Sequence, residues 1–301
     1  MKWNIIWQVD PDDLASCIER DWFYELTSLV PKGSIQVDYA AKPLLKAVLP
    51  HAIVCASTLV QTRESDLIRY LQRLPRPRIL YHMSDEIVAI GREVYQHCDL
   101  VIRNGSANFE LFNSPDFVQV PAGFESGLQN RSRALHYPSS HRRYSFAFLG
   151  MIKHERATEM LPSFERISGP HFIRQSISYA DSTRYFDQST IDVFRDTVFI
   201  PSPKGNFNPE TNRPYAALEW GCIPLIRNYR DSTYTENYYD KLLGRHPIPT
   251  FDNWSKAAEF ADGLLADSPA LDALQAQIFT WWQNHKARLQ SKVAHKIAAL
   301  I

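Results

Sequence analysis

The residues best suited to chemistry lie between Thr211 and Ile226, where an arginine precedes a short helical pattern and a buried strand. Pro214 presets the backbone of a first helical turn, and Gly221 can adopt the left-handed conformation that ends a helix. A helix N-terminus collects unpaired N–H groups, and Arg213 adds a planar, permanently charged fork beside them. This arrangement favours binding of a phosphate or pyrophosphate group; the alternative is an ordinary helix–strand unit with a surface arginine.

Strand and helix patterns alternate along the chain and must position this segment. Strands separated by helices indicate parallel sheets, so the expected fold class is α/β, with two Rossmann-like domains whose parallel sheets face a central cleft. Among the helices we expect one over residues 12–29, which opens on two acidic residues, and one over residues 155–166. The expected strands cover residues 5–9, 35–39, 52–56, 79–82, 100–102 and 117–120 in the first half, and 145–149, 172–176, 198–201 and 222–226 in the second.

Composition indicates the domain boundaries. Residues 127–143 are rich in Ser, Arg, His, Asn and Pro and poor in apolar side chains, which is typical of a linker. We therefore expect an N-terminal domain over residues 1–126 and a second α/β domain over residues 144–270, followed by a C-terminal helix over residues 271–301. A chain of 301 residues is long enough for two domains with separate cores.

Ligands of open parallel sheets bind beyond the carboxyl ends of the strands, so the residues that follow each expected strand are candidate site residues. In the first half these residues are mostly acidic and polar, whereas in the second half they are mostly basic. The first set is Ser84, Asp85, Glu86, Arg103 and Asn104, and the second set is Gly150, Lys153, His154, Arg156, Lys204, Asn206, Thr211, Asn212 and Arg213. Carboxylates beside one reactant and cations beside the other suit a group transfer with an anionic leaving group.

Five segments occur in an order and spacing that resemble the exostosin-type glycosyltransferases, most closely their ribitol xylosyltransferase branch. They are Leu80–Glu86, Val101–Asn104, Val120–Phe124, Phe146–Gly150 with Arg156 after it, and Arg213–Pro224. The resemblance implies a GT-B fold and transfer of a sugar from a nucleotide diphosphate, with a UDP-sugar favoured, to a saccharide or polyol-phosphate hydroxyl. It also implies inversion at the anomeric carbon without an essential metal, and a role in bacterial surface polysaccharide or glycan synthesis.

The resemblance implies that the second domain binds the nucleotide sugar, and the candidate donor-binding residues are Gly150, Lys153, Arg156, Lys204, Asn206, Asn212, Arg213 and Glu219. One position departs from the family pattern, because Ala216 stands where a glutamate usually holds the donor ribose. Glu219, one turn later on the same helix face, either takes over that contact or is a solvent-facing charge. The alternative for Gly150 is a plain turn, and the alternative for the loop around Lys204 is a plain connection.

Asp85 and Glu86 are the candidate catalytic residues, because a base must take the proton of the acceptor hydroxyl. Their side chains diverge at a strand end, so only one of them faces the site, and we favour Asp85. The alternative is that Asp85 caps the helix that follows. His82, Arg103 and Asn104 complete the acceptor side, although a histidine inside an apolar strand is more often a satisfied core residue than a catalyst.

Composition gives less support to other function classes. The formal net charge is zero, so no global basic field favours nucleic acid, and the four cysteines lack metal-ligand spacing. We expect no metal and no cofactor beyond the donor substrate. A non-catalytic two-lobed protein that binds a glycan or a nucleotide sugar (a degenerate transferase) stays open as the alternative to an enzyme.

No apolar stretch has the length of a signal peptide or a membrane span, so we expect a cytoplasmic protein. Residues 283–301 lack acidic side chains and carry an apolar stripe at helical spacing, formed by Leu289, Val293, Ile297 and Leu300. This helix either lies on the inner face of a membrane, close to a lipid-linked acceptor, or packs its stripe across the two domains.

Overall fold

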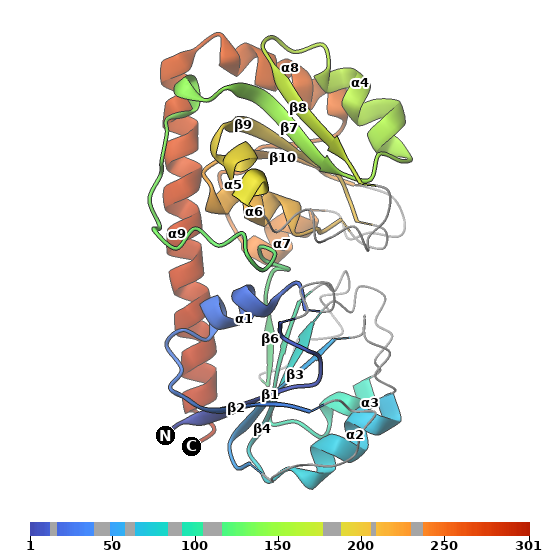
Figure 1. Cartoon of the computed structure of the whole chain (residues 1–301), viewed down its shortest axis with the longest axis vertical. Helices are drawn as coiled ribbons and strands as arrows, with labels where there is room; N and C mark the ends of the chain where they lie inside the picture. The colour runs from blue at the N-terminus through green and yellow to red at the C-terminus, as the bar shows by residue number, and fades with distance from the viewer. Residues whose placement is uncertain are drawn as a thin grey trace. The chain divides into compact units, whose positions relative to one another are not determined.

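The computed structural model describes residues 1–12, 17–38, 49–57, 64–83, 92–104, 116–176, 188–205, 209–229 and 237–301. Within this part, the chain forms two compact units. Unit 1 contains Met1–Ala122 and Lys286–Ile301, and unit 2 contains Gly123–His285. Each unit holds one parallel sheet, called sheet A in unit 1 and sheet B in unit 2 (Figure 1).

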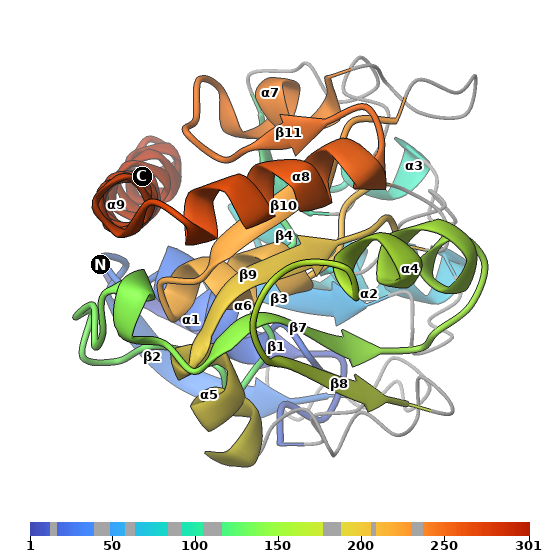
Figure 2. The same cartoon turned by 90° about the horizontal axis from the view of Figure 1, so that it is seen from above.

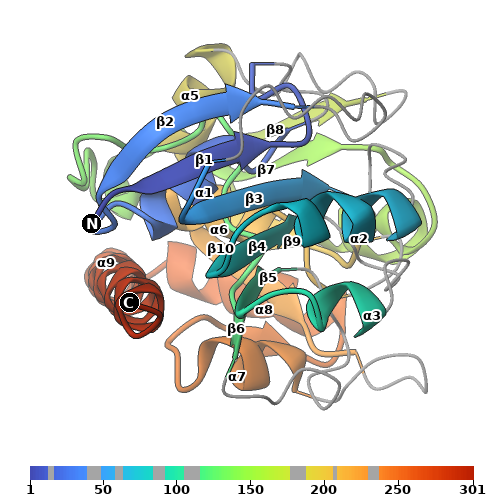
Figure 3. The same ribbon diagram turned by 90° about the horizontal axis from the view of Figure 1, so that it is seen from below.

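Sheet A has six parallel strands in the described part of unit 1, in the order β2-β1-β3-β4-β5-β6, which Figure 3 shows from below. These strands are β1 Trp3–Trp7, β2 Lys32–Val37, β3 Ala52–Ser57, β4 Arg78–Met83, β5 Leu100–Arg103 and β6 Phe117–Gln119. The helices are α1 Arg20–Leu26, α2 Glu64–Arg73 and α3 Arg92–Tyr95, joined by the end of α9, Ser268–Ala298. Because β2 and β3 lie on opposite sides of β1, the strand order reverses between β1 and β3.

Both faces of sheet A are covered, as expected for a parallel sheet. On one face, Phe23 of α1 contacts the rings of Trp7 and Tyr81, at centroid distances of 5.2 and 5.0 Å. On the other face, Leu67 and Leu71 of α2 pack in one buried cluster with apolar residues of β1, β3 and β4. Sheet A is therefore enclosed between α1 and α2.

Of the helix predicted over residues 12–29, residues 13–16 lie outside the described residues, and the described helix α1 covers only Arg20–Leu26. The backbone N–H of Asp12 donates to the carboxylate of Asp10 at 3.0 Å, and residues 17–19, directly before α1, are not helical. The two helical turns that form carry the buried Phe23, which is the contact to sheet A.

Sheet B has five parallel strands in the described part of unit 2, in the order β11-β10-β9-β7-β8. They are β7 Tyr144–Gly150, β8 His171–Gln175, β9 Thr197–Ser202, β10 Ile223–Arg227 and β11 Thr250–Phe251. The helices are η2 Ser139–His141, η3 Arg156–Met160, α4 Leu161–Phe164, α5 Gln188–Arg195, α6 Arg213–Glu219, α7 Tyr238–Leu243, α8 Trp254–Leu265 and the first part of α9. Because β8 and β9 lie on opposite sides of β7, the strand order reverses between β7 and β9.

The helices α4 and α8 lie side by side over sheet B, as Figure 2 shows from above. Phe164 of α4 contacts Phe146 of β7 and Trp254 of α8, at centroid distances of 5.4 and 6.2 Å. In addition, α6 packs on β9 and β10. This packing fixes where α6 begins relative to the ends of β7 and β9.

The helix predicted over residues 155–166 begins with a π-helical turn, Arg156–Met160, which leads into α4. Pro162 in the first turn of α4 accounts for the wider turn. Proline has no N–H to donate, and its ring crowds the carbonyl of Thr158, four residues earlier.

Residues 127–143 pack on unit 2 through a buried arginine. The guanidinium of Arg142 donates to the carbonyls of Phe194, Thr197 and Trp220 at 3.3, 2.7 and 2.8 Å. Phe194 lies in the last turn of α5, and Trp220 directly follows α6; carbonyls at helix ends lack helical partners. A single positive side chain therefore satisfies carbonyls at two helix ends.

The long helix α9 supplies residues to both units. In unit 1, Leu289, Val293 and Ile297 are 9, 0 and 2% exposed, so most of the apolar stripe predicted for this helix is buried against the protein. A bilayer does not reach these side chains in this structure, and membrane contact through the exposed Arg288 and Lys292 stays a prediction. Within the described residues, no helix is both long and apolar enough to cross a membrane.

Candidate functional site

The residue that ends β7, beside the reversal of strand order in sheet B, is Gly150. Its φ of +152° is rare for residues that carry a side chain. A Cβ atom at Gly150 would lie 2.7 Å from Nη2 of Arg213. The absence of a side chain therefore lets a guanidinium lie directly against the backbone at the end of the strand.

Arg213 begins α6 and reaches back to the end of β7. Its Nε and Nη2 atoms donate to the carbonyl of Leu149 at 3.3 and 3.1 Å. Its Cζ atom lies 4.7 Å from the centroid of the Phe148 ring, which is cation–π geometry. A backbone carbonyl and an aromatic ring thus hold the charged fork in one orientation.

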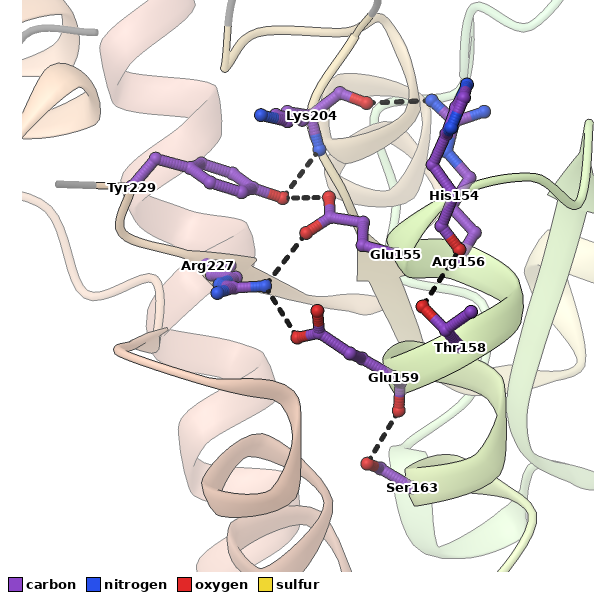
Figure 4. Close-up of polar contacts among 9 residues, drawn as sticks. All are labelled: His154, Glu155, Arg156, Thr158, Glu159, Ser163, Lys204, Arg227 and Tyr229. Carbon is purple, nitrogen blue, oxygen red and sulfur yellow. Dashed lines mark hydrogen bonds and ion pairs between the residues drawn. The ribbon is translucent and has the colours of Figure 1, made fainter. Parts of the chain in front are cut away.

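Arg156 and Lys204 meet at the same edge of sheet B (Figure 4). Arg156 donates to the carbonyls of Met151 at 3.1 Å and of Lys204 at 2.7 Å, and so ties the segment after β7 to the segment after β9. Hydrogen bonds to carbonyls orient a guanidinium without cancelling its charge. Arg156, Lys204 and Arg213, hereafter the three cations, therefore gather at one edge of the sheet beside Gly150.

Tyr229, two residues after β10, supports Lys204 in two ways. Its hydroxyl oxygen accepts the backbone N–H of Lys204 at 2.9 Å, and the Lys204 ammonium lies 5.1 Å from its ring centroid. The hydroxyl donates in turn to Glu155, whose carboxylate lies 2.9 Å from Nη1 of Arg227 (Figure 4). Burial, and then the charge of Glu155, raise the pKa of Tyr229, so the hydroxyl keeps its proton at neutral pH.

Sequence reasoning missed Glu155, Arg227 and Tyr229 as parts of this edge. Glu155 lies among Lys153, His154 and Arg156, whose positive or polar side chains alone suggested a phosphate site. Arg227 ends β10 and Tyr229 follows it, so applying the carboxyl-end rule to every strand would have found both. Their role is to brace the segments after β7, β9 and β10 against one another.

The structure describes some of the other residues that were predicted to lie around the donor. The side-chain amide of Asn212 donates to the carbonyl of Gly123 at 3.0 Å. Lys153 is half-buried in the loop after Gly150, and the neighbouring His154 is exposed, with a φ of +53°. Asn206 lies outside the described residues.

Glu219 is the last residue of α6, at the opposite end from Arg213, and it is fully buried. Its carboxylate accepts the backbone N–H of Asn130 at 3.1 Å and the indole N–H of Trp282 at 2.7 Å. The structure therefore does not bring Glu219 to the three cations but uses it to fasten Asn130 and α9 to α6. Position 216 is a buried alanine, and Glu219 is buried at the other end of the helix. Neither residue therefore places a carboxylate beside the three cations.

In unit 1, His82, Tyr95 and Arg103 form a hydrogen-bonded group. Nη1 of Arg103 and the hydroxyl of Tyr95 each lie 2.8 Å from Nδ1 of His82. Because a guanidinium only donates, Nδ1 accepts, which assigns the proton of a neutral ring to Nε2. Burial, and then the Arg103 charge, lower the pKa of His82, so the ring is neutral at pH 7. The contacts at Nδ1 are those of a buried core residue.

Of the remaining acceptor-side candidates, the structure describes Asn104. Asn104 is buried, and its amide lies 3.4 Å from a carboxylate oxygen of Glu19. Asp85 and Glu86, the candidate catalytic residues, lie outside the described residues. In the portion of the chain that is described, no group of three or more His, Cys, Asp or Glu side chains is arranged to hold a metal ion.

Replacing Gly150 with alanine is expected to displace the Arg213 guanidinium, because the added Cβ would lie 2.7 Å from its Nη2. Gly244→Ala is the matched control, since Gly244 also has a positive φ, of +71°, but has no atom within 4 Å of an added Cβ. Both variants carry backbone strain, and only Gly150→Ala should weaken UDP binding in a calorimetric titration. Equal UDP affinities for the two variants would contradict the expectation that Arg213 contacts the phosphates of a UDP-sugar.

No family model matches the chain, and no curated protein sequence matches it. Solved structures do match over nearly the whole length. Anabaena HepE in complex with UDP has a TM-score of 0.57 at 9% identity, with 100% of both chains covered. An α-glucosyltransferase in complex with UDP-glucose and abasic DNA has a TM-score of 0.57 at 12% identity, with 99% of both chains covered. The DNA-modifying enzyme β-glucosyltransferase has a TM-score of 0.55 at 9% identity, with 99% of this chain and 100% of that chain covered.

These similarities establish the fold. The chain has a GT-B glycosyltransferase fold, which confirms the predicted class of two Rossmann-like units with parallel sheets. At identities of 9 to 12%, the likeness extends to the fold alone. The resemblance to the exostosin-type family therefore stays a prediction.

Proposed function

We propose that this chain is a glycosyltransferase that moves a sugar from a nucleoside diphosphate, with UDP favoured, to a hydroxyl of a saccharide or polyol phosphate. The observation that carries the proposal is the gathering of the three cations beside Gly150, where the strand order of sheet B reverses. Ligands of open α/β sheets bind at such reversals. Three cations at one sheet edge suit the two phosphates of a leaving nucleotide.

In this reaction the acceptor oxygen attacks the anomeric carbon of the donor sugar and forms the new glycosidic bond. The bond between that carbon and the diphosphate oxygen breaks, and the nucleoside diphosphate leaves with the electron pair. The three cations stabilise the negative charge that develops on the leaving oxygen. A carboxylate takes the acceptor proton; Asp85 is the first candidate and Glu86 the second. A single displacement of this kind inverts the anomeric carbon, as the exostosin-type resemblance implies.

The similar structures support a UDP-sugar donor, since the HepE structure is a complex with UDP and the α-glucosyltransferase structure is a complex with UDP-glucose. Two of these enzymes are described with DNA, but the zero net charge of this chain favours a saccharide or polyol-phosphate acceptor over nucleic acid. Kinship with exostosin-type enzymes, independence of a metal, and bacterial glycan synthesis in the cytoplasm or at the inner face of a membrane belong to the same proposal.

The test is to incubate the purified chain with UDP-glucose or UDP-xylose and a panel of saccharide and polyol-phosphate acceptors. Release of UDP, together with a glycosylated product identified by mass, is the expected result. UDP binding without product for any donor and acceptor pair would instead favour the non-catalytic nucleotide-sugar-binding protein. A chain that neither binds UDP nor forms product would contradict both functions.

A further inference from the structure

Three polar side chains meet in unit 1, past the carboxyl ends of β1 and β2. The Tyr70 hydroxyl lies 3.2 Å from Oδ2 of Asp38, and Gln8 lies close enough to this hydroxyl to lower the pKa of Tyr70. The sheet itself places two of them, because the N–H of Asp38 donates to the carbonyl of Trp7 at 2.8 Å and the N–H of Gln8 to that of Cys55 at 2.9 Å. Gln8 therefore lies between Asp38 and the end of β3.

The position of Gln8 in the topology is that of a ligand site. The chain runs from β1 to β2 on one side and later returns to β3 on the other, so the strand order of sheet A reverses beside Gln8. Ligands of open α/β sheets bind beyond the carboxyl ends of the strands at such a reversal. Sheet B has its own reversal of strand order at Gly150, where the three cations gather. Gln8 and Gly150 thus occupy equivalent positions in the topology of their sheets, but the side chains around them differ in charge.

The amide of Gln8 is the second observation that points to a ligand. Gln8 is 1% exposed, and among the described residues neither Nε2 nor Oε1 has a hydrogen-bond partner of acceptable geometry. The amide lies near the Tyr70 hydroxyl but does not meet hydrogen-bond geometry with it. Buried amides without partners are rare, because each lost hydrogen bond costs stability. A ligand hydroxyl would satisfy both atoms.

The three side chains select the ligand class by what they donate and accept. A carboxylate only accepts, whereas an amide and a phenol each donate and accept. Burial, and then the charge of Asp38, raise the pKa of Tyr70, so its hydroxyl keeps its proton. Closely spaced donors and acceptors match the hydroxyl groups of a sugar or a polyol, in contrast to the three cations, which match phosphates.

We propose that Gln8, Asp38 and Tyr70 bind the hydroxyl groups of a neutral sugar or polyol portion of the acceptor. This inference rests on the proposed glycosyl transfer, since it gives unit 1 the acceptor and unit 2 the donor. It adds three residues to the acceptor side, none of which sequence reasoning had selected.

The experiment is saturation-transfer NMR on the full chain with UDP present and with D-glucose and ribitol as the probes. The wild type should transfer saturation to protons of at least one probe, and Gln8→Met and Asp38→Asn should lose this transfer. Glu93→Gln, which removes an exposed carboxylate on α3 of the same unit, should keep it. Calorimetric titration with UDP on each variant shows that unit 2 is folded and that the donor site is intact.

Probe binding that survives in both Gln8→Met and Asp38→Asn would overturn the inference, and so would a wild type that binds UDP but neither probe. If Gln8→Met does not fold, Asp38→Asn and Tyr70→Phe decide the matter, because each keeps the size of the side chain. Failure of the wild type to bind UDP would count against the donor site instead. Probe binding lost in the variants would still support the acceptor site in that case.

Discussion

Replacing Arg213 with alanine is expected to weaken UDP binding by about 10- to 100-fold, because a hydrogen bond to a charged group contributes about 1.5–3 kcal/mol. Its guanidinium is held against Leu149 and Phe148 at the end of β7, so a diphosphate at Gly150 would meet a fork that is already oriented. The rate of UDP release from UDP-glucose should fall further, by about 100-fold or more, since negative charge grows on the leaving oxygen in the transition state. Calorimetry gives the affinity, and a UDP-release assay gives the rate.

Two further variants make the Arg213 result specific. Arg213→Lys keeps the charge but loses the planar fork, so it should lie between the wild type and Arg213→Ala in both measurements. Arg166→Ala removes an exposed arginine beyond α4 and lowers the net charge equally, so it should behave as the wild type. UDP affinity that is the same in Arg213→Ala and Arg166→Ala would rule out the proposed contact with the diphosphate.

Replacing Arg142 with alanine is expected to lower the melting temperature by roughly 6–12 °C, which corresponds to about 3 kcal/mol for a unit of this size. The reason is that the carbonyls of Phe194, Thr197 and Trp220 would lose the donor that now serves all of them. Two of these carbonyls belong to helix ends, whose partial negative charge also favours the guanidinium. Circular dichroism during heating measures the change.

The neighbouring Arg143 offers the matched control for Arg142. Arg143 is exposed and lies over the Tyr144 ring, with its Cζ atom 5.0 Å from the ring centroid. Arg143→Ala removes the same charge from the same segment but leaves no buried carbonyl without a donor, so it should melt close to the wild type. If Arg142→Ala melts no lower than Arg143→Ala, the buried hydrogen bonds contribute nothing measurable to stability.

The alternation of strands and helices was predictable because it depends on local patterns. A buried parallel strand needs a short apolar run, and the runs at 52–56, 79–82 and 145–149 all form strands within a residue or two of the expected bounds. The carboxyl-end rule also selected Gly150, Arg156, Lys204 and Arg213 from sequence order alone, and the structure brings these residues together.

The residue at which a helix begins was harder to predict. The acidic residues at positions 12 and 13 suggested a helix start there, whereas the described helix α1 begins at Arg20. A pattern read along the chain counts acidic residues near a helix start as favourable. Such a pattern does not by itself fix the residue at which the helix begins.

Contacts between residues far apart in the chain were decided by tertiary structure. Glu219 occupies a helix position suited to a ligand, yet its carboxylate is taken by Asn130 and Trp282, which lie 89 and 63 residues away. Tyr229 owes its role to Glu155, 74 residues earlier, and the partnership of Gln8, Asp38 and Tyr70 exists only because β2 and α2 pack beside β1. The sequence by itself determined which residues follow the strands and so which chemistry was available at the sheet edges. The packing decided which of those side chains face one another, because a polar group is free for a ligand only where no distant part of the chain already satisfies it.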